Sequence, residues 1–256
     1  MRIDIITLFP YGLKGFLNQS ILGKAQKKSL VKINLHNLRE FAKDKRKTVD
    51  GRPYGGGMGM ILKPDVVVEA IEAIKSSQLT VNGSQKRNTV NPASPAGRRE
   101  PRIVKPYVIL LDPKGKLFNQ EKAKELAKKD WLVVVCGHYE GIDERVRNFV
   151  DEEISIGDYI LGGGEAAALV LVDTIVRLLP GVLAKVGAKE IESFQKSLLE
   201  YPQYTRPANF RGLKVPEILF SGNLKEIAKW RKRKALRLTK SQRPDLLEEF
   251  KKIEKD

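Results

Sequence analysis

The sequence is poor in the residues that build disulfide bonds and metal sites. Its 256 residues include one cysteine, Cys136, and two histidines, His36 and His138. A single cysteine cannot form a disulfide within one chain, which suits a reducing compartment, so we expect a cytoplasmic protein. The same scarcity argues against a thiolate or histidine-rich metal centre. Cys136 lies in the apolar run WLVVVCG, which favours a small buried side chain over a nucleophile.

Long hydrophobic runs are also missing. The most apolar stretch, residues 165–179, is interrupted by Asp173 and Arg177, so we expect no membrane span. The opening residues MRIDIITLFP have too short an apolar segment for a secretory signal, and they predict a first β-strand instead.

The common nucleotide-binding fingerprints are absent. GDYILGGGE, residues 157–165, places three glycines between a predicted strand and a predicted helix. It has neither the lysine and Ser/Thr of a phosphate-binding loop nor the spacing of a dinucleotide fingerprint. This disfavours a kinase, a GTPase or an NAD-dependent enzyme, and it raises the question of what the glycines approach.

Acidic residues are few relative to basic ones. Lys and Arg number 47 against 31 Asp and Glu, a net charge of +16, which favours a nucleic-acid partner over a merely soluble basic surface. Near the C-terminus, Asn223 with Glu226 predicts the start of a helix. That helix has nine basic residues and one acidic residue between Lys225 and Arg243. Its apolar side is predicted to contain Leu224, Ile227, Trp230 or Arg231, and Leu238. The opposite face therefore predicts contact with an RNA or DNA backbone.

Strand-like and helix-like segments alternate, which predicts an α/β fold with a parallel sheet covered on both faces. The expected strands are residues 2–9, 30–38, 107–112, 131–136 and 152–161, and the expected helices are 65–77 (with Asp65 as N-cap), 119–129, 142–149 and 165–179. Residues 44–62 predict a long loop without regular structure. Residues 76–106 predict a flexible insertion, for which a solvated loop is favoured over an RNA-binding arm. We expect a first domain at 1–180, a linker at 181–200 and a second domain at 201–256.

Three glycine-bearing corners follow predicted strands: LLDPKG (110–115), CGHYEG (136–141) and IGDYILGGG (156–164). The carboxyl ends of parallel strands share one edge of a sheet, where open sheets bind ligands. Glycines there let main-chain groups approach a planar polar ligand such as adenine. Glu140, Asp158 and Glu165 add carboxylates, although Glu165 is equally suited to capping its helix. Asp173 and Arg177 form either a buried ion pair or, for Arg177, a contact in the site.

Several blocks, taken in order, resemble the bacterial tRNA (guanine-37-N1)-methyltransferases, the TrmD family of the SPOUT superfamily. The blocks are VDGRPYGGGMGM, CGHYEGIDERV, SIGDYILGGGE, RLLPGVL, ESF, YPQYTRP and WRKRKALRLTKSQRPDLL. The resemblance covers nearly the whole chain apart from 76–106. It implies methyl transfer from S-adenosyl-L-methionine to N1 of guanosine-37 in tRNA. It also implies a parallel-sheet SPOUT fold with a C-terminal trefoil knot, a homodimer with a shared active site, and a small helical C-terminal domain that holds the tRNA.

The resemblance assigns roles residue by residue. Arg177 matches the arginine that stabilises guanine O6, and Glu192 aligns with the catalytic aspartate that deprotonates N1. The expected substrate contacts are Arg52, Tyr54, Gly55, Gly56, Gly57, Arg231 and Arg233. The expected cofactor contacts are Leu111, Asp112, Gly137, Glu140, Ile156, Gly157, Asp158, Tyr159, Ile160, Leu161, Gly163 and Gly164. Members of the family also use Mg²⁺, and no residue pattern in this sequence assigns a site to it.

The chain departs from the family at identifiable positions. Glu192 is one methylene longer than the expected aspartate, and residues 166–168 are Ala-Ala-Ala where Leu-Pro-Ala is usual. These departures keep two other functions open: a non-catalytic RNA-binding or ribosome-assembly protein with the same fold, and an enzyme that modifies another guanosine or a ribose hydroxyl.

Overall fold

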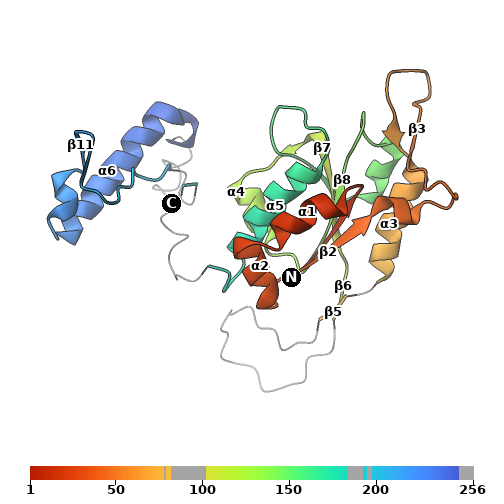
Figure 1. Ribbon diagram of the computed structural model, residues 1–256, viewed down its shortest axis with the longest axis horizontal. Coiled ribbons are helices and arrows are strands. Elements are labelled where there is room, and N and C mark those ends of the chain that lie inside the picture. The colour runs from red at the N-terminus through yellow and green to blue at the C-terminus, as the bar shows by residue number, and fades with distance from the viewer. Residues whose placement is uncertain (78, 82–101, 184–192, 195–197, 248–256) are drawn as a thin grey trace, which may run out of the picture. The chain divides into compact units, whose positions relative to one another are not determined.

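The computed structural model describes residues 1–77, 79–81, 102–183, 193–194 and 198–247 (Figure 1). The chain divides into two compact units, Met1–Ala184 and Lys185–Asp256, and each is described by itself. The division falls inside the predicted linker, residues 181–200.

The first unit is built on a five-stranded sheet with the order β2-β1-β8-β7-β9. Every neighbouring pair in it is parallel, which confirms the predicted α/β class. The strands are β1 (Arg2–Thr7), β2 (Lys32–Asn37), β7 (Tyr107–Leu117), β8 (Trp131–Cys136) and β9 (Glu152–Ser155). All six residues of β8 are buried, as expected of a central strand with helices on both faces.

Two apolar cores flank the sheet. One contains side chains of α1 (Pro10–Leu17), α2 (Ser20–Lys27), α4 (Gln120–Leu126) and α5 (Glu165–Leu178). The other contains side chains of α3 (Pro64–Ser76), the 3₁₀ helix η1 (Leu38–Phe41) and the 3₁₀ helix η2 (Glu144–Phe149). Side chains of β8 enter the two cores alternately, because successive residues of a strand point to opposite faces. Figure 1 shows α1 beside α5.

Several predicted boundaries are wrong. The strand expected at 107–112 continues to Leu117, so the first glycine corner lies within β7. The strand expected at 152–161 ends at Ser155, because the chain turns at Gly157, whose φ is +152°. Residues 156–164 therefore form a loop. The helix expected to be capped by Asp65 begins one residue earlier, with Pro64 in its first turn and Lys63 as the N-cap. Proline suits that position because its missing N–H would have no helical partner there.

The two segments expected to lack regular structure contain short ladders. Within 44–62, β3 (Asp50–Gly51) pairs with β4 (Ile61–Leu62). Within 76–106, β5 (Leu79–Val81) pairs with β6 (Arg102–Val104), also antiparallel. Residues 82–101, the middle of the predicted insertion, lie outside the described residues.

A charged network is buried in the sheet at Asp4, whose side chain is inaccessible to solvent. Its carboxylate accepts hydrogen bonds from Arg2 (2.6 Å) and from Trp131 Nε1 (2.7 Å), and from Asn34 Nδ2 (2.9 Å). His36 Nε2 lies 2.8 Å from the same carboxylate. Burial alone would raise the pKa of Asp4, but the hydrogen bonds from His36, Arg2, Asn34 and Trp131 outweigh it and lower the pKa to about 2.

The second unit contains a short hairpin, β10 (Asn209–Phe210) with β11 (Leu213–Lys214), the 3₁₀ helix η4 (Glu217–Phe220) and α6 (Leu224–Gln242). The predicted helix start is confirmed, since Asn223 Oδ1 accepts a hydrogen bond from Glu226 N at 3.3 Å. Ile227 and Trp230 are buried, as is Thr239. Leu224, predicted to be on the apolar side, is 79% exposed. It is the first residue of α6, and the buried side chains begin one turn later, at Ile227.

Candidate functional site

The three glycine corners meet around one cavity of about 450 Å³ at the carboxyl ends of β8 and β9 and beside the middle of β7. Eleven of the twelve predicted cofactor residues line it: Leu111, Asp112, Gly137, Glu140, Ile156, Gly157, Tyr159, Ile160, Leu161, Gly163 and Gly164. Asp158 is not part of the lining. The sheet therefore brings together residues that are up to 53 positions apart in the sequence.

The first corner wraps around the end of β9. Ile154 pairs with both Leu111 and Lys116 of β7, so the segment between them passes over it. A Cβ at Gly115 would lie 2.4 Å from the backbone nitrogen of Ile154, which leaves room only for glycine. Just beyond, Phe118 N donates a hydrogen bond to Ser155 O at 2.7 Å. The close crossing fixes this wall of the cavity.

The second and third corners are joined main chain to main chain. Gly164 N donates a hydrogen bond to Gly137 O at 2.7 Å, and His138 forms a β-bridge with Gly163. A Cβ on Gly164 would lie 2.8 Å from the Cα of Cys136. Glycine is required here by backbone packing, and the packing holds the two corners in register.

A polar chain lies behind that junction. Thr7 Oγ1, at the end of β1, donates to Glu165 Oε1 at 2.7 Å, and Glu165 Oε2 lies 4.0 Å from His138 Nδ1. That ring nitrogen is buried and has no hydrogen-bond partner among the described residues. The His138 ring packs edge-on against Phe9 and Tyr139. Glu165 thus contacts the strand end and faces the histidine of the second corner, a role beyond the helix cap.

The third corner is shaped by the loop that replaces the predicted strand. Ser155 Oγ donates to Gly157 O (3.1 Å) and accepts from Gly157 N (3.2 Å). Tyr159 folds back so that its hydroxyl donates to Ile156 O at 3.2 Å. Ile160 lines the cavity and is 82% exposed, so part of the rim of the cavity is an apolar side chain that faces solvent.

The glycine-rich loop between β3 and β4 reaches the second corner. Glu140 N donates to Met60 O at 3.0 Å, and Leu62 N donates to Gly141 O at 2.9 Å. Gly59, with a φ of +79°, has no space for a Cβ because the Glu140 side chain fills it. The predicted substrate residues of this loop (Arg52, Tyr54, Gly55, Gly56 and Gly57) are near this junction in sequence but do not line the cavity. Tyr54 is 98% exposed.

One carboxylate of the cavity lining, Asp112, belongs to a network of ion pairs. Arg147 contacts Asp112 at 3.3 Å and also pairs with Glu144 and Glu153. Cys136 is fully buried behind the second corner, and burial, with the Glu165 carboxylate nearby, raises the pKa of its thiol well above the ordinary value. The expectation that Cys136 is a buried structural residue is confirmed.

The predicted catalytic pair is not assembled by the described part of the first unit. Arg177 lies in the last turn of α5, twelve residues after Glu165, and it does not line the cavity. Glu192 lies outside the described residues. Arg231 and Arg233 are exposed on α6 in the second unit, where the Arg231 guanidinium lies 4.8 Å from the Tyr201 ring centroid.

Sequence reasoning missed nine lining residues: Pro113, Lys114, His138, Tyr139, Gly141, Ile142, Ile154, Ser155 and Ala167. Most are neighbours of predicted residues in the same corners, so the corners were found but their full extent was not. His138 had a usable signal, because it follows Gly137 directly after the end of a strand, the kind of position that faces a ligand.

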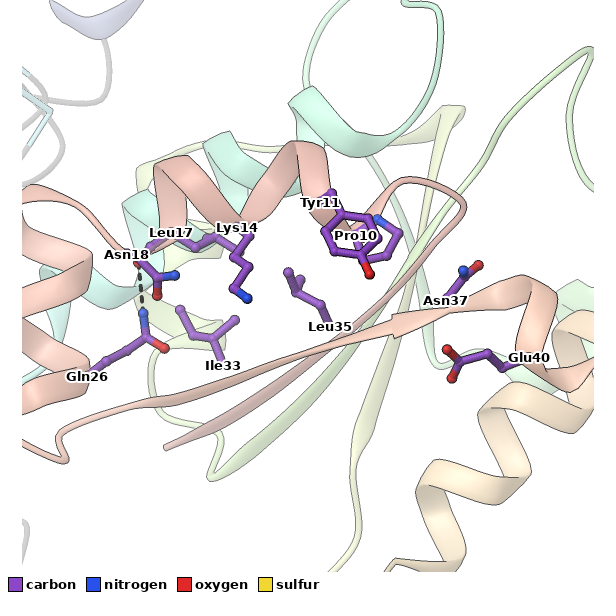
Figure 2. A pocket seen from close by; sticks show the side chains of 10 residues that line it. All are labelled: Pro10, Tyr11, Lys14, Leu17, Asn18, Gln26, Ile33, Leu35, Asn37 and Glu40. Carbon is purple, nitrogen blue, oxygen red and sulfur yellow. Dashed lines mark hydrogen bonds between the residues drawn. The ribbon is translucent and has the colours of Figure 1, made fainter.

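A second cavity, about 380 Å³, lies between α1, α2 and β2 and shares no lining residue with the first (Figure 2). Ile33 and Leu35 form its floor, Lys14 reaches over them from α1, and Gln26 Nε2 donates to Leu17 O at 2.7 Å. No residue predicted from the sequence lies in it.

The described residues contain no group of three His, Cys, Asp or Glu side chains placed to hold a metal ion. No helix among them is long and apolar enough to cross a membrane.

Comparison with known proteins gives a consistent match. The family model described as tRNA (Guanine-1)-methyltransferase TrmD matches residues 1–249. Proteins named tRNA (guanine-N(1)-)-methyltransferase are similar along nearly their whole length. One from Geobacillus kaustophilus is 52% identical (98% of this chain, 93% of the relative), and one from Sulfurihydrogenibium sp. is 51% identical (98% and 89%). One from Dictyoglomus turgidum is 47% identical (100% and 94%). This chain, with its parallel sheet and three joined glycine corners, belongs to the TrmD family of tRNA (guanine-1)-methyltransferases.

Proposed function

We propose that this protein transfers a methyl group from S-adenosyl-L-methionine to N1 of guanosine-37 in tRNA. The observation that carries the proposal is the cavity at the carboxyl edge of the sheet, lined by eleven of the twelve residues that the family resemblance assigns to the cofactor. Family membership and the names of the relatives support the reaction class.

The cavity suits an adenosine-bearing sulfonium. Close main-chain packing makes its back wall, where a Cβ at Gly137 would lie 3.2 Å from Leu111 O. A flat ring fits such a wall, and exposed carbonyl and N–H groups can bond its polar edge. Glu140 adds a carboxylate that complements the positive charge of the ligand. The bound cofactor supplies an electrophilic methyl group. A Mg²⁺ requirement is a further expectation, to which we attach no residue.

The chain's own groups must manage a proton and a developing charge. Guanine N1 is protonated at neutral pH, so a base has to accept that proton as the methyl arrives. We assign this role to Glu192, in place of the aspartate of the family. We assign to Arg177 the stabilisation of negative charge that grows on guanine O6.

The position of Arg177 supports a homodimer with a shared active site. Twelve residues of α-helix rise about 18 Å, so Arg177 lies far along α5 from the cavity at the helix start. A second copy can supply the arginine that one chain cannot bring to its own cavity. Apolar side chains for such contact are exposed near and on two adjacent helices: Phe9 (49%), Tyr11 (85%), Phe16 (51%) and Val170 (46%).

Other features support the finer parts of the proposal. The wrapping of the segment between Leu111 and Lys116 around β9 is consistent with a trefoil knot in the first unit. The exposed cations of α6, including Arg231 and Arg233, form the basic face we assign to tRNA in a C-terminal domain at 201–256. We assign to the loop with Arg52, Tyr54 and Gly55–Gly57 the closing over the target base, and the packing of the Glu140 side chain against Gly59 of this loop supports the assignment.

The proposal is tested by incubating the protein with a tRNA transcript that has guanosine at position 37 and with labelled S-adenosyl-L-methionine. Nucleoside mass spectrometry should then find N1-methylguanosine at that position. A methylated ribose, or a methyl group elsewhere, would favour the altered-target alternative. Absence of both methyl transfer and calorimetric binding of the cofactor would favour a non-catalytic RNA-binding protein, whereas micromolar cofactor binding would contradict that alternative.

A further inference from the structure

We infer that the turn Lys45–Lys47 of the first unit is an RNA-backbone clamp, a second phosphate-binding surface besides α6. The inference rests on the proposed function, since it concerns how the same tRNA is held. It starts from an exposed charged cluster that neither the cavity nor the basic helix accounts for: Lys45, Arg46 and Lys47.

The turn has a fixed shape. Its carboxylate, Asp44, accepts hydrogen bonds from Arg46 N (3.2 Å) and Thr48 N (2.9 Å), and also from Thr48 Oγ1 (2.8 Å). Lys47 N donates to Asp44 O at 3.1 Å, and Lys47 has a φ of +57°. Both ends are buried, at Ala42 (5% exposed) and Val49 (inaccessible). A backbone ordered before binding lowers the entropic cost of holding a partner.

The cations on this turn are not neutralised within the described residues. Lys43 pairs with Glu69 at 3.1 Å, but Lys45, Arg46 and Lys47 have no carboxylate within ion-pair distance there. The Asp44 carboxylate accepts hydrogen bonds from Thr48, and these bonds lower the pKa of Asp44. The carboxylate therefore stays ionised and bonded within its own turn. The turn therefore presents three adjacent positive charges on a rigid support.

The turn is connected to the wall of the cavity through β3 and β4. It leads directly into β3, whose partner β4 bonds to Gly141 in the second corner through Leu62 N. Val49 O also accepts a hydrogen bond from Lys63 N at 2.8 Å. When one base of a polyanion enters the cavity, the phosphates on either side of that base must lie on the surface around it. The turn carries its three cations on the segment that continues into β3 and β4, which are bonded to the second corner.

The chemistry favours an RNA backbone over an acidic protein segment. The turn is entirely polar at its tip, with no exposed aromatic or aliphatic anchor of the kind that protein interfaces use. Consecutive lysine and arginine side chains match a row of phosphates, which bind through charge and counterion release without sequence reading. The contribution of the turn is thus to position tRNA, and methyl-donor binding should be independent of it.

The test compares two triple variants of the full chain. The first is Lys45→Ala with Arg46→Ala and Lys47→Ala. The matched control is Lys24→Ala with Lys27→Ala and Lys28→Ala, which removes three exposed lysines at the end of α2, next to the amino ends of the strands. Both lose the same charge. Measured quantities are the KM for tRNA, the dissociation constant for tRNA at several salt concentrations, the affinity for S-adenosyl-L-methionine, and the melting temperature.

For the first variant we expect a KM for tRNA raised about tenfold. We also expect a slope of log affinity against log salt reduced by about 2 to 3, roughly one for each lost phosphate contact. Cofactor affinity should stay within twofold. The control should change tRNA binding less than about threefold. If the first variant binds tRNA as tightly as the unmodified protein, the inference is wrong, and the turn Lys45–Lys47 faces an acidic protein or solvent instead of RNA. An equal loss in both variants would also overturn it, as an effect of net charge. Absence of methyl transfer by the unmodified protein would instead refute the proposed function.

Discussion

Glycines carry much of the geometry at the scale of single residues. At Gly115, Gly163 and Gly164 a methyl group would lie within 3 Å of neighbouring atoms, and none of the three has a backbone conformation that itself demands glycine. Close approach of chain to chain selects them. Glycine can be required by a left-handed backbone conformation or by the close approach of another segment, and the sequence does not tell which. The corners could therefore be located from the sequence, but the contacts within them could not.

Gly163→Ala tests the junction of the second and third corners. Its Cβ would lie 2.4 Å from Glu165 Oε2 and 2.5 Å from His138 Nδ1, so both side chains must move and the wall of the cavity with them. We expect affinity for S-adenosyl-L-methionine, measured by calorimetry, to fall at least about tenfold. Gly162→Ala is the control, because nothing lies within 4 Å of its Cβ. Equal affinities in the two variants would contradict the described junction.

Asp4→Asn tests the buried charge network. The folded pKa of Asp4, about 2, lies below its ordinary value of 3.8, so the ionised carboxylate stabilises the fold above about pH 4. That contribution, on the order of 2 kcal/mol, is lost as the pH falls from 4 towards 2. Denaturant titrations should therefore find the variant less stable at pH 6, with the difference from the unmodified protein shrinking towards pH 2. A difference independent of pH would refute this account.

At the scale of elements, most of the parallel sheet could be predicted because its strands are apolar runs bounded by turns. β8 and the start of β7 matched their predicted spans closely. The errors fall where main-chain packing overrides composition. Residues 156–161 are strand-like in sequence, yet they turn away because Gly157 and Tyr159 fold onto the cavity. The ladders β3–β4 and β5–β6 have only two and three residues per strand, too few for a periodic pattern in the sequence.

Gly115→Ala tests the crossing of β7 over β9. The added methyl group would meet the backbone of Glu153 and Ile154, which cannot rotate away as a side chain could. We expect a loss of about 2 kcal/mol or more in the free energy of unfolding. Gly12→Ala, on the exposed face of α1 with open space around its Cβ, should be neutral or stabilising in the same denaturant titration. A stable Gly115→Ala protein would mean that the two segments are not packed as described.

At the scale of the whole molecule, the proposed active site needs parts that the described chain does not bring together. The place of the cavity could be predicted because the carboxyl ends of parallel strands share one edge of a sheet. The individual cofactor residues are predictions from the family resemblance. The neighbourhood of Arg177 could not be predicted, since in the homodimer we propose the contacts of this residue would come from a second chain, which leaves no periodic signal in the sequence. Glu192 stays a prediction from the family resemblance.

Mixed dimers test the shared active site. Arg177→Ala removes the proposed O6 contact, and Gly163→Ala damages the cofactor cavity. When S-adenosyl-L-methionine is held well below its dissociation constant for the unmodified protein, each variant alone should therefore have about a tenth of the unmodified activity or less. When the two variants are mixed in equal amounts and exchange subunits, half of the dimers contain one chain of each variant. Each such dimer has one intact site. Activity should therefore recover to about a quarter of the unmodified level. No recovery, with exchange verified by mass spectrometry, would mean that each chain completes its own site.

The central claim is methyl transfer to guanine N1 at position 37, and one comparison tests it most directly. The protein is given S-adenosyl-L-methionine and two tRNA transcripts that differ only in guanosine or adenosine at position 37. The account predicts rapid formation of N1-methylguanosine in the first transcript and background labelling in the second. Equal labelling of both transcripts, or labelling of neither, would contradict it.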